Sequence, residues 1–189
     1  MMSADDHLNK VFGSTTRMGV NLQELTPVYA VIVVILYSWS LIHFFWKLPS
    51  WLDFLSAGEI SVVLAYMVVI NAVESILVLL AVLVVRWMFF WAWTDGQFIV
   101  KGVVLVVAGL GFLMLRNHYF PTKALYALTL THWLSLSGAA ILIILFPFGR
   151  IPLFQRAVAS LADRFVVFLY ISIPATILAI LIVVLRNLS

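Results

Sequence analysis

The chain has 189 residues, of which 65% are hydrophobic and only 10% are charged, and its net charge is +3. A typical soluble domain has roughly 25% charged and roughly 45–50% apolar residues, and a globule of this length cannot hide so much apolar surface from water. The composition excludes a soluble protein, and the absence of cysteine excludes disulfides, thiolate metal sites and cysteine nucleophiles.

The domain organisation follows from the distribution of polar and apolar residues. Residues 1–26 form a polar N-terminal segment without the apolar core of a cleavable signal peptide, so we expect the first span to act as the insertion signal. Residues 27–186 are predicted to form an all-α, polytopic bundle of about five transmembrane helices. The Lys and Arg residues are scattered among the loops, which argues against nucleic acid as a partner.

Five apolar segments each approach the roughly 20 residues that cross a hydrocarbon core of about 30 Å. The first begins with Pro27, a favoured first helical residue, and the second follows Ser56 and Glu59, which fit the S-x-x-E capping box. Pro174 should kink the fifth. The predicted spans are 27–46, 60–88, 98–116, 124–146 and 164–186.

Two stretches between the spans are amphipathic, and we expect them to lie at the headgroup level as short helices or turns. Residues 48–59 and 152–164 mix aromatic or aliphatic side chains with charged ones. Ordinary polar loops are the alternative, which is stronger for the first stretch than for the second.

The positive charges predict the orientation of the chain in the membrane. With five spans, seven Lys or Arg residues lie on the N-terminal side and four on the opposite side. Cytoplasmic loops carry the excess of Lys and Arg, so the N-terminus is predicted to be cytoplasmic. The aromatic residues of 87–93 are interpreted as interfacial anchors, with an aromatic cofactor site as the weaker alternative.

One carboxylate lies deep within the second predicted span. Glu74 is 14 residues beyond residue 60, about 21 Å along a helix, which places it near the bilayer centre. An ionised carboxylate there costs at least about 2.5–3.5 kcal/mol, so we expect Glu74 to be neutral. Asn71 should project from the same helical face, with Ser75 beside it. Lipid would leave these groups without partners, so the patch is predicted to point into protein.

The fourth and fifth spans are expected to supply the partners of this patch. His132 is the best candidate to meet Glu74, although their depths differ by about 9 Å at the helical rise. Small and polar side chains on these spans should let helices approach closely. These predicted packing residues are Thr131, Ser135, Ala139, Ser172 and Thr176.

The patch has two interpretations. In the first, Glu74, Asn71, Ser75 and His132 form a proton or ion site, and the chain is a channel or carrier component for protons, a cation or a small solute. The sequence narrowly favours this interpretation because it gives the costly carboxylate a role. In the second, Glu74 fixes helix packing in a non-catalytic accessory or scaffold subunit of a larger energy-converting or secretion complex. Partners are expected to be copies of the chain or other membrane subunits.

Catalytic and cofactor motifs are absent from the sequence. It contains no H-E-x-x-H, G-x-S-x-G, P-loop or Gly-rich dinucleotide fingerprint, so we expect neither an enzyme nor a cofactor. A haem held by His43 and His132 is a weak alternative, because two histidines would have to face each other at similar depth. His43 lies at the end of the first span and is interpreted as an interfacial anchor.

Overall fold

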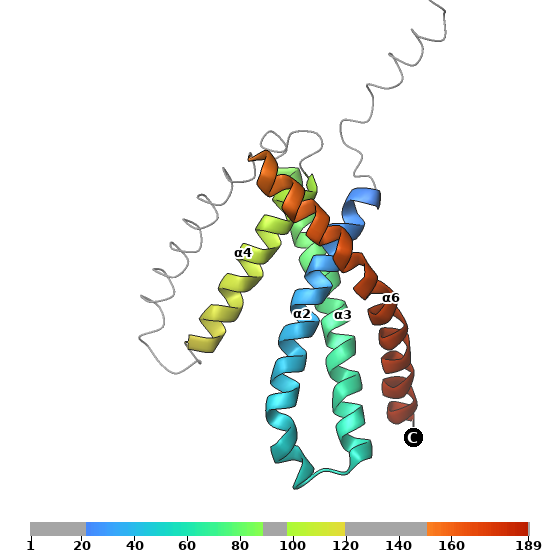
Figure 1. Cartoon of the computed structure of the whole chain (residues 1–189). Helices are drawn as coiled ribbons and strands as arrows, with labels where there is room; N and C mark the ends of the chain where they lie inside the picture. Colours follow the sequence, from blue (N-terminus) through green and yellow to red (C-terminus); the bar gives the residue numbers. More distant parts are fainter. Residues whose placement is uncertain (1–21, 89–97, 120–150, 189) are drawn as a thin grey trace, which may run out of the picture.

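The computed structural model describes residues 22–88, 98–119 and 151–188, and the regular structure in these ranges is entirely α-helical. The described helices are α2 (Leu22–Leu52), α3 (Ala57–Met88), α4 (Phe98–Tyr119) and α6 (Pro152–Leu188), shown in Figure 1. All four are long and apolar enough to cross a membrane. The described residues therefore confirm an all-helical fold whose helices are compatible with a membrane protein. The predicted number of about five spans is not matched, because the described part holds four and 124–146 lies outside it.

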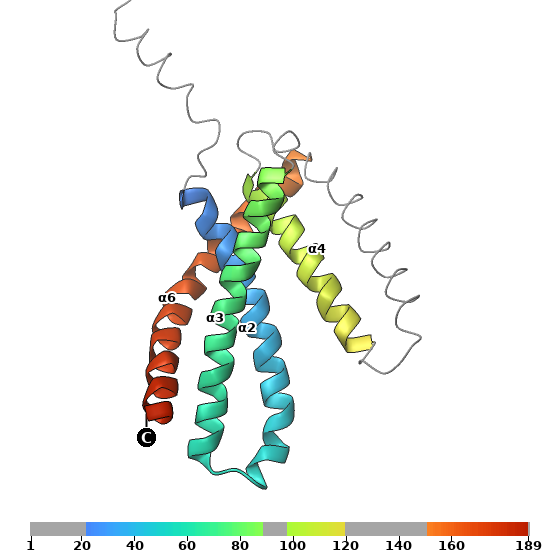
Figure 2. The same cartoon turned by 180° about the vertical axis from the view of Figure 1, so that it is seen from behind.

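The helix α2 and the antiparallel helix α3 form a hairpin, and α6 packs along both of them (Figures 1 and 2). The helix α4 begins beside the C-terminal end of α3, packs mainly on α2, and diverges from the hairpin towards its own C-terminus. The helix α6 crosses the hairpin obliquely with its first part, and its second part then runs beside α3 towards the closed end of the hairpin.

The start of α3 confirms the predicted capping box. The backbone N–H and the hydroxyl of Ser56 donate to Glu59 Oε2 at 2.8 Å and 2.9 Å, and Glu59 N–H donates back to Ser56 Oγ at 3.4 Å. These bonds satisfy N–H groups that a helix start leaves without partners. The helix therefore begins at Ala57, three residues before the predicted span.

The two amphipathic stretches do not form short helices of their own: most of their residues belong to longer helices, and residues 53–56 of the first stretch form a turn between α2 and α3. Residues 48–52 continue α2 to Leu52 through Pro49, and residues 152–164 are the first part of α6, which continues through Pro174. A proline removes one backbone hydrogen bond, and helices among other membrane helices tolerate that loss. At 37 residues, α6 is about 55 Å long, too long for a perpendicular crossing of a core about 30 Å thick. Its oblique first part takes up the excess length.

The main apolar core lies near the N-terminal end of α2 and combines side chains of all four described helices. Val28 and Ile32 of α2 are fully buried there, in one cluster with Val82 of α3, Phe98 and Val106 of α4, and Ala162 of α6. The close approach of α2 and α4 depends on Gly102, since a Cβ at this position would lie 3.2 Å from Val28 Cγ2. The outer surfaces of the helices carry exposed aliphatic side chains, as expected where lipid replaces water.

A cluster of charged and aromatic side chains joins three helices at the same end of the bundle. Arg86 Nη1 of α3 lies 3.9 Å from Glu24 Oε2 of α2, and the guanidinium sits 4.5 Å above the centre of the Phe98 ring of α4. Lys101, one turn after Phe98 in α4, is buried as well. Pairing of this kind lowers the cost of keeping cations within an apolar helix contact.

Candidate functional site

The structure separates the three polar residues of the predicted patch on α3. Asn71 is 2% exposed and Ser75 is fully buried, whereas the side chain of Glu74 is exposed. Successive residues turn by about 100° in an α-helix, so Ser75 lies about 40° from Asn71 on one side and Glu74 about 60° from it on the other. That difference takes Glu74 out of the contact with α2. Asn71 and Ser75 point into protein as predicted, and Glu74 does not do so within the described chain.

Asn71 is bonded to the neighbouring helix α2. Ser40 Oγ donates to Asn71 Oδ1 at 2.8 Å, while the buried Asn71 Nδ2 has no hydrogen-bond partner among the described residues. If the amide were turned over, Nδ2 would donate to Ser40 and Oδ1 would lack a partner instead. In both orientations one end of this amide is unpaired, which is costly inside a bundle.

Ser75 is bonded to α2 as well. Its hydroxyl donates to the carbonyl of Ala72 at 2.8 Å and lies 3.1 Å from the hydroxyl of Tyr29. A serine has a single hydroxyl proton, so Tyr29 is the donor in the bond between the two side chains. This bond gives the half-buried Tyr29 and the buried Ser75 a partner across the α2–α3 contact.

Tyr37 joins α2 to α3 and α6. Because Thr176 donates its own proton to Ser172, the single hydroxyl proton of Tyr37 is shared between Thr176 Oγ1 of α6 at 2.9 Å and the carbonyl of Val68 in α3 at 3.3 Å. Thr176 donates to the carbonyl of Ser172 at 2.7 Å, and Ser172 donates to the carbonyl of Leu169 at 3.4 Å. Thr176, predicted as a packing residue, therefore lies at a contact between helices, while Ser172 bonds within its own helix.

We call this set of side chains the polar layer: Tyr29, Tyr37, Ser40, Asn71, Ser75 and Thr176. The three members on α2, Tyr29, Tyr37 and Ser40, were not predicted from the sequence. Their spacing could have indicated a common polar face, because the helical repeat places all three side chains within an arc of about 80° around the helix axis. Direct hydrogen bonds link the layer across α2, α3 and α6. This arrangement can hold three helices in register.

Removing the Tyr37 hydroxyl should measure what the polar layer contributes. Tyr37→Phe deletes its bonds to Thr176 and Val68, and we expect a loss of about 1 kcal/mol in the free energy of unfolding, within the range known for hydrogen bonds between membrane helices. Unfolding by SDS in mixed micelles, followed by circular dichroism, would measure it. Tyr170→Phe is the control, since Tyr170 is exposed on α6. Equal stabilities of the two variants would contradict a role of the layer in packing.

The remaining predicted residues are placed as follows. Thr131, His132, Ser135 and Ala139 lie outside the described residues, so the contact between His132 and Glu74 stays a prediction. The same holds for a haem that would need His132. The other proposed haem ligand, His43, is bonded through Nδ1 to the carbonyl of Trp39 at 2.9 Å, and its ring lies 4.5 Å from the ring of Trp39.

No protein family, characterised protein or solved structure matches this chain. Its function therefore has to be inferred from the positions of its own residues: a polar layer bonded within the bundle, and a carboxylate on the outer face of α3.

Proposed function

We propose that this chain is a non-catalytic subunit of a larger membrane complex, which it joins through the face of α3 that carries Glu74. The observation behind the proposal is the exposure of this carboxylate halfway along a membrane-spanning helix. Its neighbours on that face, Ile70, Val73 and Leu77, are exposed as well. These four residues are called the Glu74 face below.

The depth of Glu74 makes contact with lipid unfavourable. It lies 17 residues from the start of α3 and 14 from the end, so it is close to the middle of the bilayer. An ionised carboxylate there costs at least about 2.5–3.5 kcal/mol, and a protonated one would still lack hydrogen-bond partners in hydrocarbon. Glu74 has no hydrogen bond or ion pair with another described residue. A partner helix that bonds the carboxyl group would remove this cost.

The carboxyl group of the Glu74 face favours a contact with a different subunit over a contact with a second copy of the chain. Two copies related by a two-fold axis along the membrane normal would present Glu74 at the same depth. At least one of the two carboxyl groups would then have to be protonated for them to meet, because two like charges at close range repel. A helix that offers a basic, amide or hydroxyl side chain at mid-depth accepts either state of Glu74.

The polar layer supports the same proposal. Its side chains bond to one another across α2, α3 and α6 and do not include Glu74. Ion pathways need groups that exchange partners, whereas these contacts suit the packing of one rigid subunit. Among the described residues, these bonds hold the helices together without Glu74, whose carboxyl group is therefore free for a contact outside this set.

Transport is the second candidate, and the same carboxylate favours it, since ionisable residues at mid-depth often mark proton or cation paths. In this alternative, Glu74 lines a water-filled path between copies of the chain. It needs a closed homo-oligomer, because in the described part of one chain Glu74 is exposed at the outer surface of α3.

We further propose that the chain has five spans and a cytoplasmic N-terminus, as expected from its sequence. The helices α2, α4 and α6 all begin at the same end of the bundle (Figure 1). Two successive helices that cross in the same direction require a return crossing between them, so we retain 124–146 as the intervening span. The excess of Lys and Arg at the N-terminal side gives the orientation.

Native mass spectrometry after mild detergent extraction from the source membrane tests the proposal. We expect one complex of fixed stoichiometry in which this chain accompanies at least one different membrane protein. A closed ring of copies would favour transport instead. A lone chain under conditions that preserve other membrane complexes would contradict both.

A further inference from the structure

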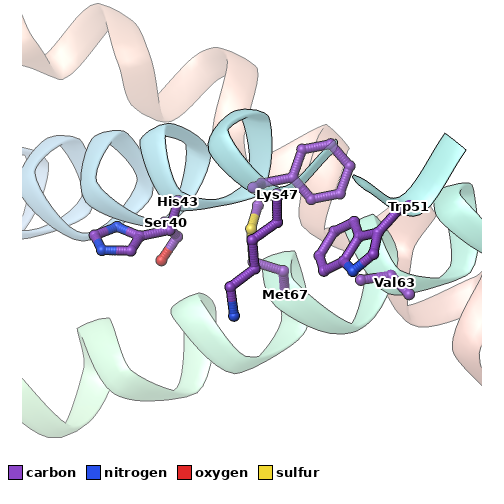
Figure 3. A pocket seen from close by; sticks show the side chains of 7 residues that line it. Ser40, His43, Lys47, Trp51, Val63 and Met67 are labelled. Carbon is purple, nitrogen blue, oxygen red and sulfur yellow. The ribbon is translucent and has the colours of Figure 1, made fainter. Parts of the chain in front are cut away.

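A groove opens between α2 and α3 near the closed end of the hairpin, with a cavity volume of about 240 Å³. Figure 3 shows its side chains reaching into the space between the two helices. It is lined by Ser40, His43, Phe44, Lys47, Trp51, Val63 and Met67. Enclosed small-molecule pockets usually have roughly 300–1,000 Å³, so this open groove suits one part of a long, amphiphilic molecule.

The groove runs from the headgroup level into the hydrocarbon. The 31 residues of α2 measure about 46 Å, which exceeds the core by about 8 Å at each end. Lys47 is five residues from the end of α2, about 8 Å along the axis, and therefore lies at the core boundary. Val63 and Met67 are progressively deeper on α3, and Trp51 is nearer to water.

Lys47 carries the permanent positive charge among the residues that line the groove. Ser40 is bonded to Asn71, and His43 to the carbonyl of Trp39. The Lys47 side chain is exposed, makes no ion pair with a described residue, and extends across the groove towards α3 in Figure 3. The nearby acidic residues of the turn and the start of α3, Asp53 and Glu59, do not line the groove, and Glu59 is bonded to Ser56.

The rest of the lining is apolar. Phe44 and Trp51 pack edge to face with ring centres 5.5 Å apart, and form one wall at the outer level. Phe44 is buried, and Val63 and Met67 face it from α3. An ammonium group at the headgroup level above an apolar channel complements a molecule with a negative head and a hydrocarbon tail.

We propose that this groove binds an anionic phospholipid, with its phosphate on the Lys47 ammonium and one acyl chain along Phe44, Val63 and Met67. Trp51 packs beside the glycerol region, where its ring meets apolar groups and its N–H can reach a polar one. The site is independent of the Glu74 face and of the partner proposed for it.

Binding is tested on the delipidated full-length chain in mild detergent, by native mass spectrometry during titration with phosphatidylglycerol or phosphatidylcholine that carry the same oleoyl chains. We expect phosphatidylglycerol to bind more tightly. Lys47→Gln should weaken it about fivefold, the effect of one lysine near an anionic lipid surface. Arg156→Gln, which removes an exposed charge from α6, should leave it unchanged. Val63→Trp should weaken binding although Lys47 is retained, because the larger ring fills the groove.

Three results would overturn the proposal. Equal affinity of the wild-type chain for the two lipids would show that the charge of the head is not recognised. Equal effects of Lys47→Gln and Arg156→Gln, or none for Val63→Trp in a chain with unchanged helix content, would remove the groove from the interaction. Displacement of the lipid by glycerol phosphate at the same concentration would identify a site for soluble anions instead.

Discussion

Glu74→Leu should release the chain from its membrane complex, and Glu74→Gln should leave most of it assembled. Leucine removes the group that bonds the partner, whereas glutamine keeps its size and its hydrogen-bonding capacity. Hydrogen bonds between membrane helices reach about 1.7 kcal/mol, so the leucine variant should retain about tenfold less partner after extraction. Co-purification with a tagged chain, quantified against the wild type, measures the loss.

The matched control for this result is Asp163→Leu, which removes an exposed carboxylate from the oblique part of α6. It should not change the amount of partner retained. Equal losses for Asp163→Leu and Glu74→Leu would contradict a specific contact at the Glu74 face. If Glu74→Gln left the assembly intact and abolished a proton or cation flux, the second candidate function would replace the first.

Gly102→Leu should destabilise the bundle by about 1–3 kcal/mol, the usual cost of overpacking a core. The new side chain would start 3.2 Å from Val28 Cγ2, and Val28 is fully buried and cannot move aside without shifting α2. Gly102→Ala should be less destabilising than Gly102→Leu, because it adds a single methyl group at this contact and gains about 1 kcal/mol in helix propensity. Unfolding by SDS in mixed micelles, followed by circular dichroism, measures both variants.

Gly111→Leu is the control for Gly102, because Gly111 lies on the same helix and a Cβ there would meet no atom of the described residues within 4 Å. Leucine has the higher helix propensity by up to about 1 kcal/mol, so this control should be neutral or stabilising. A loss of stability at Gly111 as large as that at Gly102 would show that the contact between α2 and α4 is not the cause.

The sequence predicted the helical, membrane-spanning architecture well, for physical reasons. Apolar runs of bilayer length and the Ser56–Glu59 capping box are local signals, and the described helices confirm both. The continuation of α2 through Pro49 and the union of 152–164 with the last span were not predicted. Proline and charged residues end helices in water more readily than among other membrane helices, so local signals overestimated the breaks.

The site could be predicted only in part, because the orientation of a side chain depends on which helices surround it. Asn71 and Ser75 were expected inside, and they are buried. The spacing of Asn71 and Glu74 allowed a common face, but about 60° of rotation places one inside the contact with α2 and the other outside it. The role of Tyr37 was not predicted because its partners, Val68 and Thr176, lie on α3 and α6, and no local sequence pattern indicates which helices pack against α2.

The most direct test of a contact at the Glu74 face is site-specific photo-crosslinking in the native membrane. A benzophenone amino acid incorporated during synthesis in place of Leu77 or of Ile177 provides the crosslinker without a labelling reaction, which apolar surroundings and a bound partner would prevent at position 77. Both positions are similarly exposed, at 59% on α3 and 63% on α6. The proposal predicts that position 77 forms one discrete adduct with a different membrane protein and that position 177 does not form this adduct. An adduct of position 77 with lipid alone, with residues of its own chain or with a second copy would contradict it.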